Sequence, residues 1–348
     1  MANLLQKHFP MIRDQKMIIE EIQNSVALKE IFQSWEQDQQ EEFLNFCTGV
    51  KGVKILYDVF VKEVLNPNID STPLSDLLSV ILMRKVQIIE VLPNDDSRIT
   101  ASASLIVTDI LVVFEDRSYG NVEIQKIGYM FPGERAACYS ADLLLRQYKR
   151  VRDKKRKKFS YKDMKPVYTI VFFEKSPKEF HVNKDKYIHN IYPTSDTGIE
   201  LQLLQNYSFI ALDIYKENRQ NKGINTKLDA WMVFLSSDEP EDVVELITKY
   251  PEFKSMYEII YELCLNTEKV MNMFSKELRM MDDNTVAYMI DVMQEEIDAQ
   301  KKALMEKDEK LDTQKKALDE KDAELSTQKD EILSLRKELE LLKNKLQE

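Results

Sequence analysis

Residues 108–127 read TDILVVFEDRSYGNVEIQKI, and this stretch decides the fold. Two runs rich in β-branched and aromatic residues, 104–116 and 120–127, stand on either side of the turn sequence DRSYG. Such runs joined by a short turn predict an antiparallel β-hairpin. We therefore expect two neighbouring strands of a sheet here.

Polar side chains within this hairpin are the first functional candidates. Asp109 interrupts an apolar strand, where a charge is costly unless it is paired or bound to a cation. The hairpin brings Asp109 close to Glu123, and strand alternation places Glu123 and Gln125 on one face and Lys126 on the other. Two carboxylates and an amide can hold Mg²⁺ (or Mn²⁺) in oxygen coordination. The alternative is a satisfied buried aspartate or a solvent-facing glutamate on an antiparallel strand, because this spacing alone is a weak pattern.

The neighbouring segments extend the hairpin into an α/β fold. The apolar pattern predicts a helix at 73–82 and a strand at 85–93 before it, then a helix at 134–151 and a strand at 166–175 after it. The last strand is apolar almost throughout, as expected for a strand covered on both faces. The order α-β-β-β-α-β predicts a mixed sheet with helices packed on it, between helical flanks.

A helical tail begins near residue 298, where the composition changes. Residues 298–348 hold 14 acidic and 12 basic side chains, no glycine, proline or aromatic residue, and three 14-residue repeats. Leucine or isoleucine recurs every seven residues from Leu304 to Leu346, which is typical of a coiled coil. A coiled coil needs two apolar core positions in each heptad, and here the second one is mostly polar. The alternative is therefore a lone solvated helix with i,i+4 ion pairs. We expect the helix that carries this tail to begin near Asp283.

These patterns divide the chain into four expected segments. They are an N-terminal helical region (1–72), the α/β core (73–235), a helical segment (236–297) and a heptad-repeat coiled coil (298–348).

Composition excludes several classes of protein. The chain of 348 residues has only 7 glycines, well below the typical share of about 7%, which favours helices over a glycine-rich β architecture. Its three cysteines are far apart and suit a reducing cytoplasm rather than a disulfide framework. There is no apolar run of the length of a signal or membrane span and no phosphate-binding or dinucleotide-binding loop. We expect a soluble cytoplasmic protein with no membrane contact and no nucleotide cofactor.

A strongly basic run overlaps the end of the helix predicted at 134–151. The run KRVRDKKRKK (149–158) has eight basic side chains, although the whole chain carries a net charge of -11. Such a run binds phosphates with salt-dependent and sequence-independent affinity, and an ordinary solvated loop is the alternative. The predicted DNA-binding residues are Lys149, Arg150, Arg152, Lys154, Lys155, Arg156, Lys157 and Lys158.

The stretches 108–150 and 159–177 resemble the PD-(D/E)XK nuclease family transposases, also called recombination-promoting nucleases. The similarity extends upstream to ILYDVFVKEVLNPN (55–68) and LLSVILMRKVQIIEVLPNDDSRI (77–99), and downstream to the charged repeats. It implies a restriction-endonuclease-like αβββαβ core. It also implies a metal-dependent DNA endonuclease from a bacterial mobile element, with a role in DNA recombination.

The resemblance assigns the catalytic roles to Asp109, Glu123 and Gln125, with Asp109 and Glu123 holding the metal. Gln125 stands where the wider superfamily has lysine. Glutamine at this position is typical of the branch that this sequence resembles. Glutamine can orient a water but contributes no charge. Arg135 or Lys149 is a candidate to supply that charge.

The resemblance also places the helix predicted at 134–151 beside the active site. Its polar residues Arg135, Tyr139 and Gln147 are the expected supporting residues. An acid from the first helix often completes the metal site in this superfamily, and Asp76 and Glu63 are the candidates.

The favoured interpretation is a Mg²⁺-dependent DNA endonuclease that hydrolyses phosphodiester bonds. The alternative is a catalytically degenerate DNA-binding or scaffolding protein, in which Gln125 marks a lost activity and the coiled coil is the functional part. A homodimer through residues 298–348 would pair two nuclease cores, so that both strands are cut within one complex.

Overall fold

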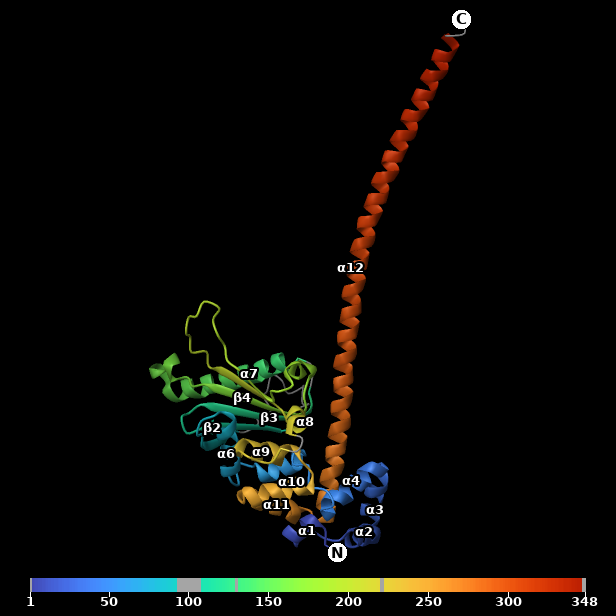
Figure 1. Cartoon of the computed structure of the whole chain (residues 1–348). Coiled ribbons are helices and arrows are strands. Elements are labelled where there is room, and N and C mark those ends of the chain that lie inside the picture. Colours follow the sequence, from blue (N-terminus) through green and yellow to red (C-terminus); the bar gives the residue numbers. More distant parts are fainter. Residues whose placement is uncertain (1, 93–107, 129–130, 220–221, 346–348) are drawn as a thin grey trace. The chain divides into compact units, whose positions relative to one another are not determined.

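The computed structural model describes residues 2–92, 108–128, 131–219 and 222–345. In this part of the chain, six strands form one mixed sheet in the order β1-β2-β3-β4-β6-β5 (Figure 1). The strands are β1 (Ile88–Leu92), β2 (Thr108–Phe114), β3 (Tyr119–Ile127), β4 (Val167–Lys175), β5 (Ile188–Ile191) and β6 (Gln205–Ala211). The pairs β1–β2, β2–β3 and β5–β6 are antiparallel, whereas β3, β4 and β6 run parallel.

Helices account for most of the remaining described chain. The α-helices are α1 (Leu4–His8), α2 (Gln15–Asn24), α3 (Val26–Ser34), α4 (Gln37–Thr48), α5 (Asp58–Val64), α6 (Thr72–Ile81), α7 (Pro132–Lys155), α8 (Leu212–Arg219), α9 (Lys227–Ser236), α10 (Pro240–Lys249), α11 (Glu252–Leu263) and α12 (Thr267–Lys345). Three short 3-10 helices are η1 (Arg156–Lys158), η2 (Tyr161–Asp163) and η3 (Lys178–Asn183).

The two faces of the sheet pack against different helices. On one face, Ile124 and Phe172 belong to a large core that includes Trp231 of α9. On the other face, Phe173 packs in a smaller cluster with Ala136 of α7. Figure 1 shows α7 and α9 on opposite sides of the strands. Because α7 connects the parallel strands β3 and β4, it is the crossover helix that covers the second face.

The hairpin between β2 and β3 closes through a tight turn. The amide of Phe114 donates to the carbonyl of Ser118 at 2.9 Å, and Asp116 Oδ1 accepts the amide of Ser118 at 2.9 Å. Arg117 adopts a left-handed conformation with φ of 67°. At Gly120, an added Cβ would lie 2.7 Å from the ring of Phe114, so the close cross-strand contact requires glycine.

The α/β fold class, with its mixed sheet, helical flanks and long C-terminal helix, is confirmed. Two strands and two α-helices were not predicted, β5, β6, α8 and α9, and neither were the three short 3-10 helices. Helix α12 begins at Thr267, earlier than the predicted start near Asp283, and α7 continues to Lys155, so most of the basic run is helical. The first part of the strand predicted at 104–116 falls outside the described residues.

The chain divides into two compact units, Met1–Tyr288 and Met289–Glu348. In the first unit, one continuous core receives side chains from the expected segments 1–72, 73–235 and 236–297. The second unit is the remainder of α12. Within the described residues, no helix combines the length and the apolar character needed to cross a bilayer.

Candidate active site on strands β2 and β3

Strands β2 and β3 pair so that Asp109 stands directly opposite Glu123. Residues opposite each other in an antiparallel pair belong to the same face of the sheet. Two positions further along β2, Leu111 packs in a cluster with Leu143 of α7, so alternation assigns position 109 to the face that α7 covers. The backbone register thus brings together the positions of the two predicted carboxylates. The side chain of Asp109 itself lies outside the described residues.

Glu123 is the centre of a buried polar group on β3. Its exposed fraction is 0%, and those of Asn121 and Gln125 are 3% and 4%. Asn121 Nδ2 donates a hydrogen bond to Glu123 Oε1 at 2.6 Å, and Gln125 Nε2 donates to Glu123 Oε2 at 3.4 Å. A buried carboxylate needs such donors because it has lost its water. The two amides therefore hold the Glu123 carboxylate in one orientation.

Three buried oxygen atoms in and beside this group lack a hydrogen-bond partner among the described residues. They are Asn121 Oδ1, Gln125 Oε1 and Thr169 Oγ1. Thr169 of β4 pairs in register with Asn121, so the two lie next to each other across the strands. Buried oxygens without a partner are costly and commonly mark the place of a water or an ion. Carboxylate and amide oxygens are the donors that Mg²⁺ and Mn²⁺ prefer, so the residues present fit a divalent cation.

Few of the described carboxylates lie close enough to Glu123 to bind a metal ion together with it. Among the side chains that the structure describes, no three His, Cys, Asp or Glu residues gather closely enough to hold a metal ion. Asp109 is outside that set, so the strands offer Glu123 together with position 109 opposite it. Amide oxygens and water would have to complete the coordination of a cation bound here.

The model of the PD-(D/E)XK nuclease family transposases matches residues 56–290, about two thirds of the chain. The chain belongs to this family. The match includes all strands of the sheet, the Asp109–Glu123 register and the basic end of α7, and it stops close to the boundary between the two compact units. The comparisons with curated proteins and with solved structures found no match.

Lys126 takes no part in the polar group, because it lies on the opposite face of β3, as alternation predicts. It forms a buried ion pair with Glu277 of α12, and its ammonium lies 3.8 Å from the centre of the Tyr57 ring. Burial lowers the pKa of Lys126, and the neighbouring carboxylates Glu277 and Glu174 oppose that shift. Within this nuclease family member, Lys126 thus links the site strand to α12 rather than supplying the charge that Gln125 lacks.

Helix α7 carries the three predicted supporting residues. Arg135 and Tyr139 are half-buried and stand one turn apart near its start. Gln147 is 1% exposed, and its amide forms two hydrogen bonds with the backbone of Lys165, at 3.1 and 2.8 Å. These bonds fix the chain that enters β4, so the Gln147 amide is already engaged in the fold.

All eight side chains of the basic run are exposed at the end of α7 and in η1. Two of them have acidic neighbours: Arg150 pairs with Glu90 at 2.5 Å, and Lys155 pairs with Asp163. Exposed ion pairs of this kind contribute little to stability. The basic run therefore presents a charged surface rather than a structural network.

The two candidates for a first-helix acid have other partners. Asp76 of α6 accepts a hydrogen bond from Trp231 Nε1 at 2.7 Å and pairs with Lys227 at 3.2 Å, on the face of the sheet opposite Glu123. Glu63 of α5 lies 3.8 Å from Lys269 of α12. The structure brings neither of them to the buried polar group of β3.

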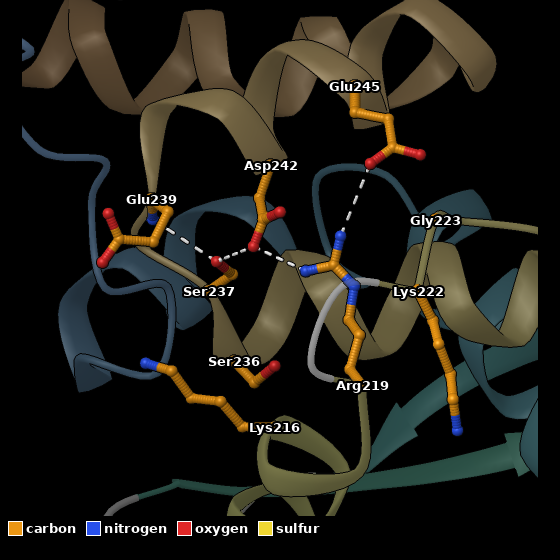
Figure 2. A pocket seen from close by; sticks show the side chains of 9 residues that line it. All are labelled: Lys216, Arg219, Lys222, Gly223, Ser236, Ser237, Glu239, Asp242 and Glu245. Atoms are coloured by element: carbon orange, nitrogen blue, oxygen red, sulfur yellow. Dashed lines mark hydrogen bonds and ion pairs between the residues drawn. The ribbon is translucent and has the colours of Figure 1, made fainter.

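A hollow of about 400 Å³ lies between α8, α9 and α10 and contains none of the predicted site residues (Figure 2). Figure 2 shows Arg219 between two acids, with Asp242 at 2.5 Å and Glu245 at 3.6 Å. Although partial burial opposes it, the hydrogen bonds from Arg219 and Ser237 hold the pKa of Asp242 below its ordinary value. The arginine is thus neutralised inside the fold, and the hollow does not present it to an anion.

Sequence reasoning missed Asn121 and Thr169. A signal for Asn121 was available, because polar residues at 121, 123 and 125 alternate along one strand and therefore share a face. No such signal exists for Thr169, because it is a single threonine in a mostly apolar strand and only the pairing of β3 with β4 places it beside Asn121.

Proposed function

We propose that this nuclease family member is a Mg²⁺-dependent DNA endonuclease that hydrolyses phosphodiester bonds. The observation that supports the proposal is the buried Glu123 carboxylate, held by two amides and standing opposite Asp109 in the strand register. Asp109, Glu123 and Gln125 are the proposed catalytic residues, and Asp109 and Glu123 are the proposed metal ligands. A bound Mg²⁺ or Mn²⁺ would supply charge neutralisation at the phosphate and activation of a water.

The protein's own groups have distinct proposed roles. Glu123 and Asp109 would hold the cation, while Asn121 keeps the Glu123 carboxylate oriented. The free amide oxygen of Gln125 accepts a hydrogen bond from the attacking water and aligns it. Because Gln125 contributes no charge, Arg135 is the proposed cationic residue of the site, with Tyr139 beside it and Lys149 as the other candidate.

The proposed substrate is DNA, either that of a bacterial mobile element or the DNA into which the element inserts. We propose that cleavage takes place in the cytoplasm and promotes recombination. The exposed basic run supports DNA binding, because its cations can neutralise several phosphates without reading the base sequence. The proposed phosphate-binding residues are Lys149, Arg150, Arg152, Lys154, Lys155, Arg156, Lys157 and Lys158.

Cleavage of supercoiled and linear DNA in Mg²⁺, Mn²⁺ or EDTA tests the proposal, with Asp109→Ala as the blank. We expect nicking that requires the divalent cation and that the blank lacks. Isothermal calorimetry should show Mn²⁺ binding by the unmodified protein and a loss of that binding in the blank. The matched control is Asp116→Ala, a carboxylate of the same hairpin that lies in the turn.

The second candidate function is a catalytically degenerate DNA-binding or scaffolding protein. One observation favours it. Gln125, which is uncharged, lies beside the fully buried Glu123 carboxylate, at the position where a catalytic lysine would supply a positive charge. In that case DNA binding would persist, calorimetry would detect no cation uptake that depends on Asp109, and neither Mg²⁺ nor Mn²⁺ would produce cleavage.

The C-terminal unit is the proposed homodimer interface. In α12, the residues of the seven-residue series, Leu304, Leu311, Leu318, Leu325, Ile332 and Leu339, are between 51% and 64% exposed. A continuous aliphatic stripe on one helix is buried when a second copy supplies the same stripe in a coiled coil.

Deletion of residues 298–348 is expected to convert a dimer into a monomer, because it removes this stripe while leaving the first compact unit intact. Light scattering of the full chain and of the shortened chain measures the change. A shortened protein that remains dimeric would place the interface in the first unit. The control is the triple substitution Asp308→Asn, Asp312→Asn and Asp319→Asn, which leaves the stripe untouched.

A further inference from the structure

Three aromatic rings cluster where the basic run leaves α7. Tyr161 of η2 stacks on Tyr148 of α7, with ring centres 6.3 Å apart and planes 15° from parallel. Phe159 packs edge-on against both, at 5.4 Å from Tyr148 and 5.3 Å from Tyr161. The guanidinium of Arg152 donates a hydrogen bond to the Tyr148 hydroxyl at 2.7 Å. Tyr161 therefore stacks on a tyrosine whose own position is fixed by a hydrogen bond.

The chain after α7 is folded so that it returns to the helix. Arg156 ends α7 with a positive φ of 48°, which is uncommon for a residue other than glycine and turns the backbone sharply. Ser160 caps η2, and Asp163 of η2 pairs with Lys155 of α7. These contacts hold Tyr161 against the helix, so its position does not depend on the aromatic stacking alone.

Tyr161 is nevertheless 77% exposed. Since one side of the ring faces Tyr148, this exposure leaves the other side open to solvent. A ring that served only to cover the cluster would be expected to bury more of its area. The exposed ring is thus available for a planar partner.

The surroundings of Tyr161 are strongly basic. Between residues 149 and 165 there are ten basic and two acidic side chains, a net charge of +8. Among the described residues, no carboxylate pairs with Lys154, Lys157 or Lys158, and all three are exposed. An open aromatic ring among free cations is the arrangement with which proteins bind single-stranded nucleic acid, by stacking the bases and neutralising the phosphates.

We propose that Tyr161 stacks on an unpaired base, so that the end of α7 and the η1–η2 segment bind single-stranded DNA in preference to duplex DNA. The proposal rests on DNA being the substrate of the proposed function. Duplex phosphates account for the cations but not for the exposed ring, because bases within a duplex are already stacked on one another. An overhang, a flap or a melted segment offers the free base face that Tyr161 requires.

Fluorescence anisotropy of the full chain in EDTA tests the proposal without cleavage. The probes are a labelled single strand, the blunt duplex of the same sequence, and that duplex with a single-stranded overhang. Tyr161→Ala is expected to weaken binding of the single strand and of the overhang by about five- to tenfold, the low end of base stacking on an aromatic side chain. Binding of the blunt duplex should change less than about twofold.

Two further variants separate stacking from charge. Tyr161→Trp keeps a planar ring and should restore single-strand binding. Lys157→Ala should weaken both DNA forms similarly and lower the salt dependence of binding by about one phosphate contact. An equal loss on single-stranded and duplex DNA in Tyr161→Ala, or no loss on either, would overturn the proposal. Absence of cleavage in Mg²⁺ would contradict the proposed nuclease function and leave this binding preference standing.

Discussion

Glu123→Gln is expected to reduce Mg²⁺-dependent DNA cleavage by roughly 10²- to 10³-fold without unfolding the protein. Loss of a metal-binding carboxylate removes several kcal/mol of transition-state stabilisation, and each 1.36 kcal/mol is about tenfold in rate. The substitution keeps the size of the side chain and an oxygen that can accept the hydrogen bond from Asn121. The initial rate of nicking of supercoiled DNA measures the loss, and thermal unfolding of the variant checks the fold.

Asn121→Ala is the matched companion to Glu123→Gln. It removes the donor that orients the carboxylate but leaves the negative charge in place. A positioning residue of this kind typically changes metal affinity by about 10- to 100-fold. We therefore expect the Mg²⁺ concentration for half-maximal cleavage to rise, with a smaller change in the maximal rate. Cleavage by Glu123→Gln at the unmodified rate would show that the carboxylate on β3 is not a catalytic ligand.

The hairpin was predictable because its signals are local. Its turn and two strands lie within 20 residues. Alternation along the strand places Glu123 and Gln125 on one face and Lys126 on the other, and the structure has the same arrangement. The prediction of a helix after β3 was also correct, although α7 extends further than its apolar pattern.

Strand β6 was missed although it lies between β4 and β5 in the sheet. It passes directly from Ala211 into α8 at Leu212, with no turn residue between the two elements. The apolar run of the strand therefore merges with the apolar face of the helix, and the change of period is hidden. Tertiary pairing with β4, which the sequence does not display, selects the strand.

The partners of buried charges were not predictable for a related reason. Lys126 belongs to the hairpin, but its carboxylate partner Glu277 lies far away in the sequence, on α12. Only the packing of α12 against the sheet brings them together. The sequence identifies which face of β3 Lys126 occupies, and the three-dimensional fold determines what it meets there.

The buried ion pair of Lys126 and Glu277 leads to the largest expected effect on stability. The side chains are 3% and 1% exposed, so each charge has lost its hydration. The Tyr57 ring beside the ammonium provides further electrostatic stabilisation. Removing Glu277 leaves the buried Lys126 charge without its ion-pair partner and with only the more weakly acting Glu174 carboxylate nearby, and breaking a buried pair in this way typically costs about 3–5 kcal/mol. We therefore expect Glu277→Ala to lower the free energy of unfolding by that amount in urea titrations.

The double variant Lys126→Met with Glu277→Leu distinguishes a charge effect from a packing effect. It removes both charges and keeps most of the volume, so it should recover the stability that Glu277→Ala loses. The single variants Lys126→Met and Glu277→Leu are measured alongside it. If the loss of unfolding free energy in the double variant equals the sum of the losses in these two, packing rather than uncompensated charge causes the loss. Because Lys126 follows Gln125 on β3 but faces the opposite side of the sheet, the double variant should also retain DNA cleavage. Loss of cleavage in a stably folded double variant would mean that the ion pair with α12 positions the site strand.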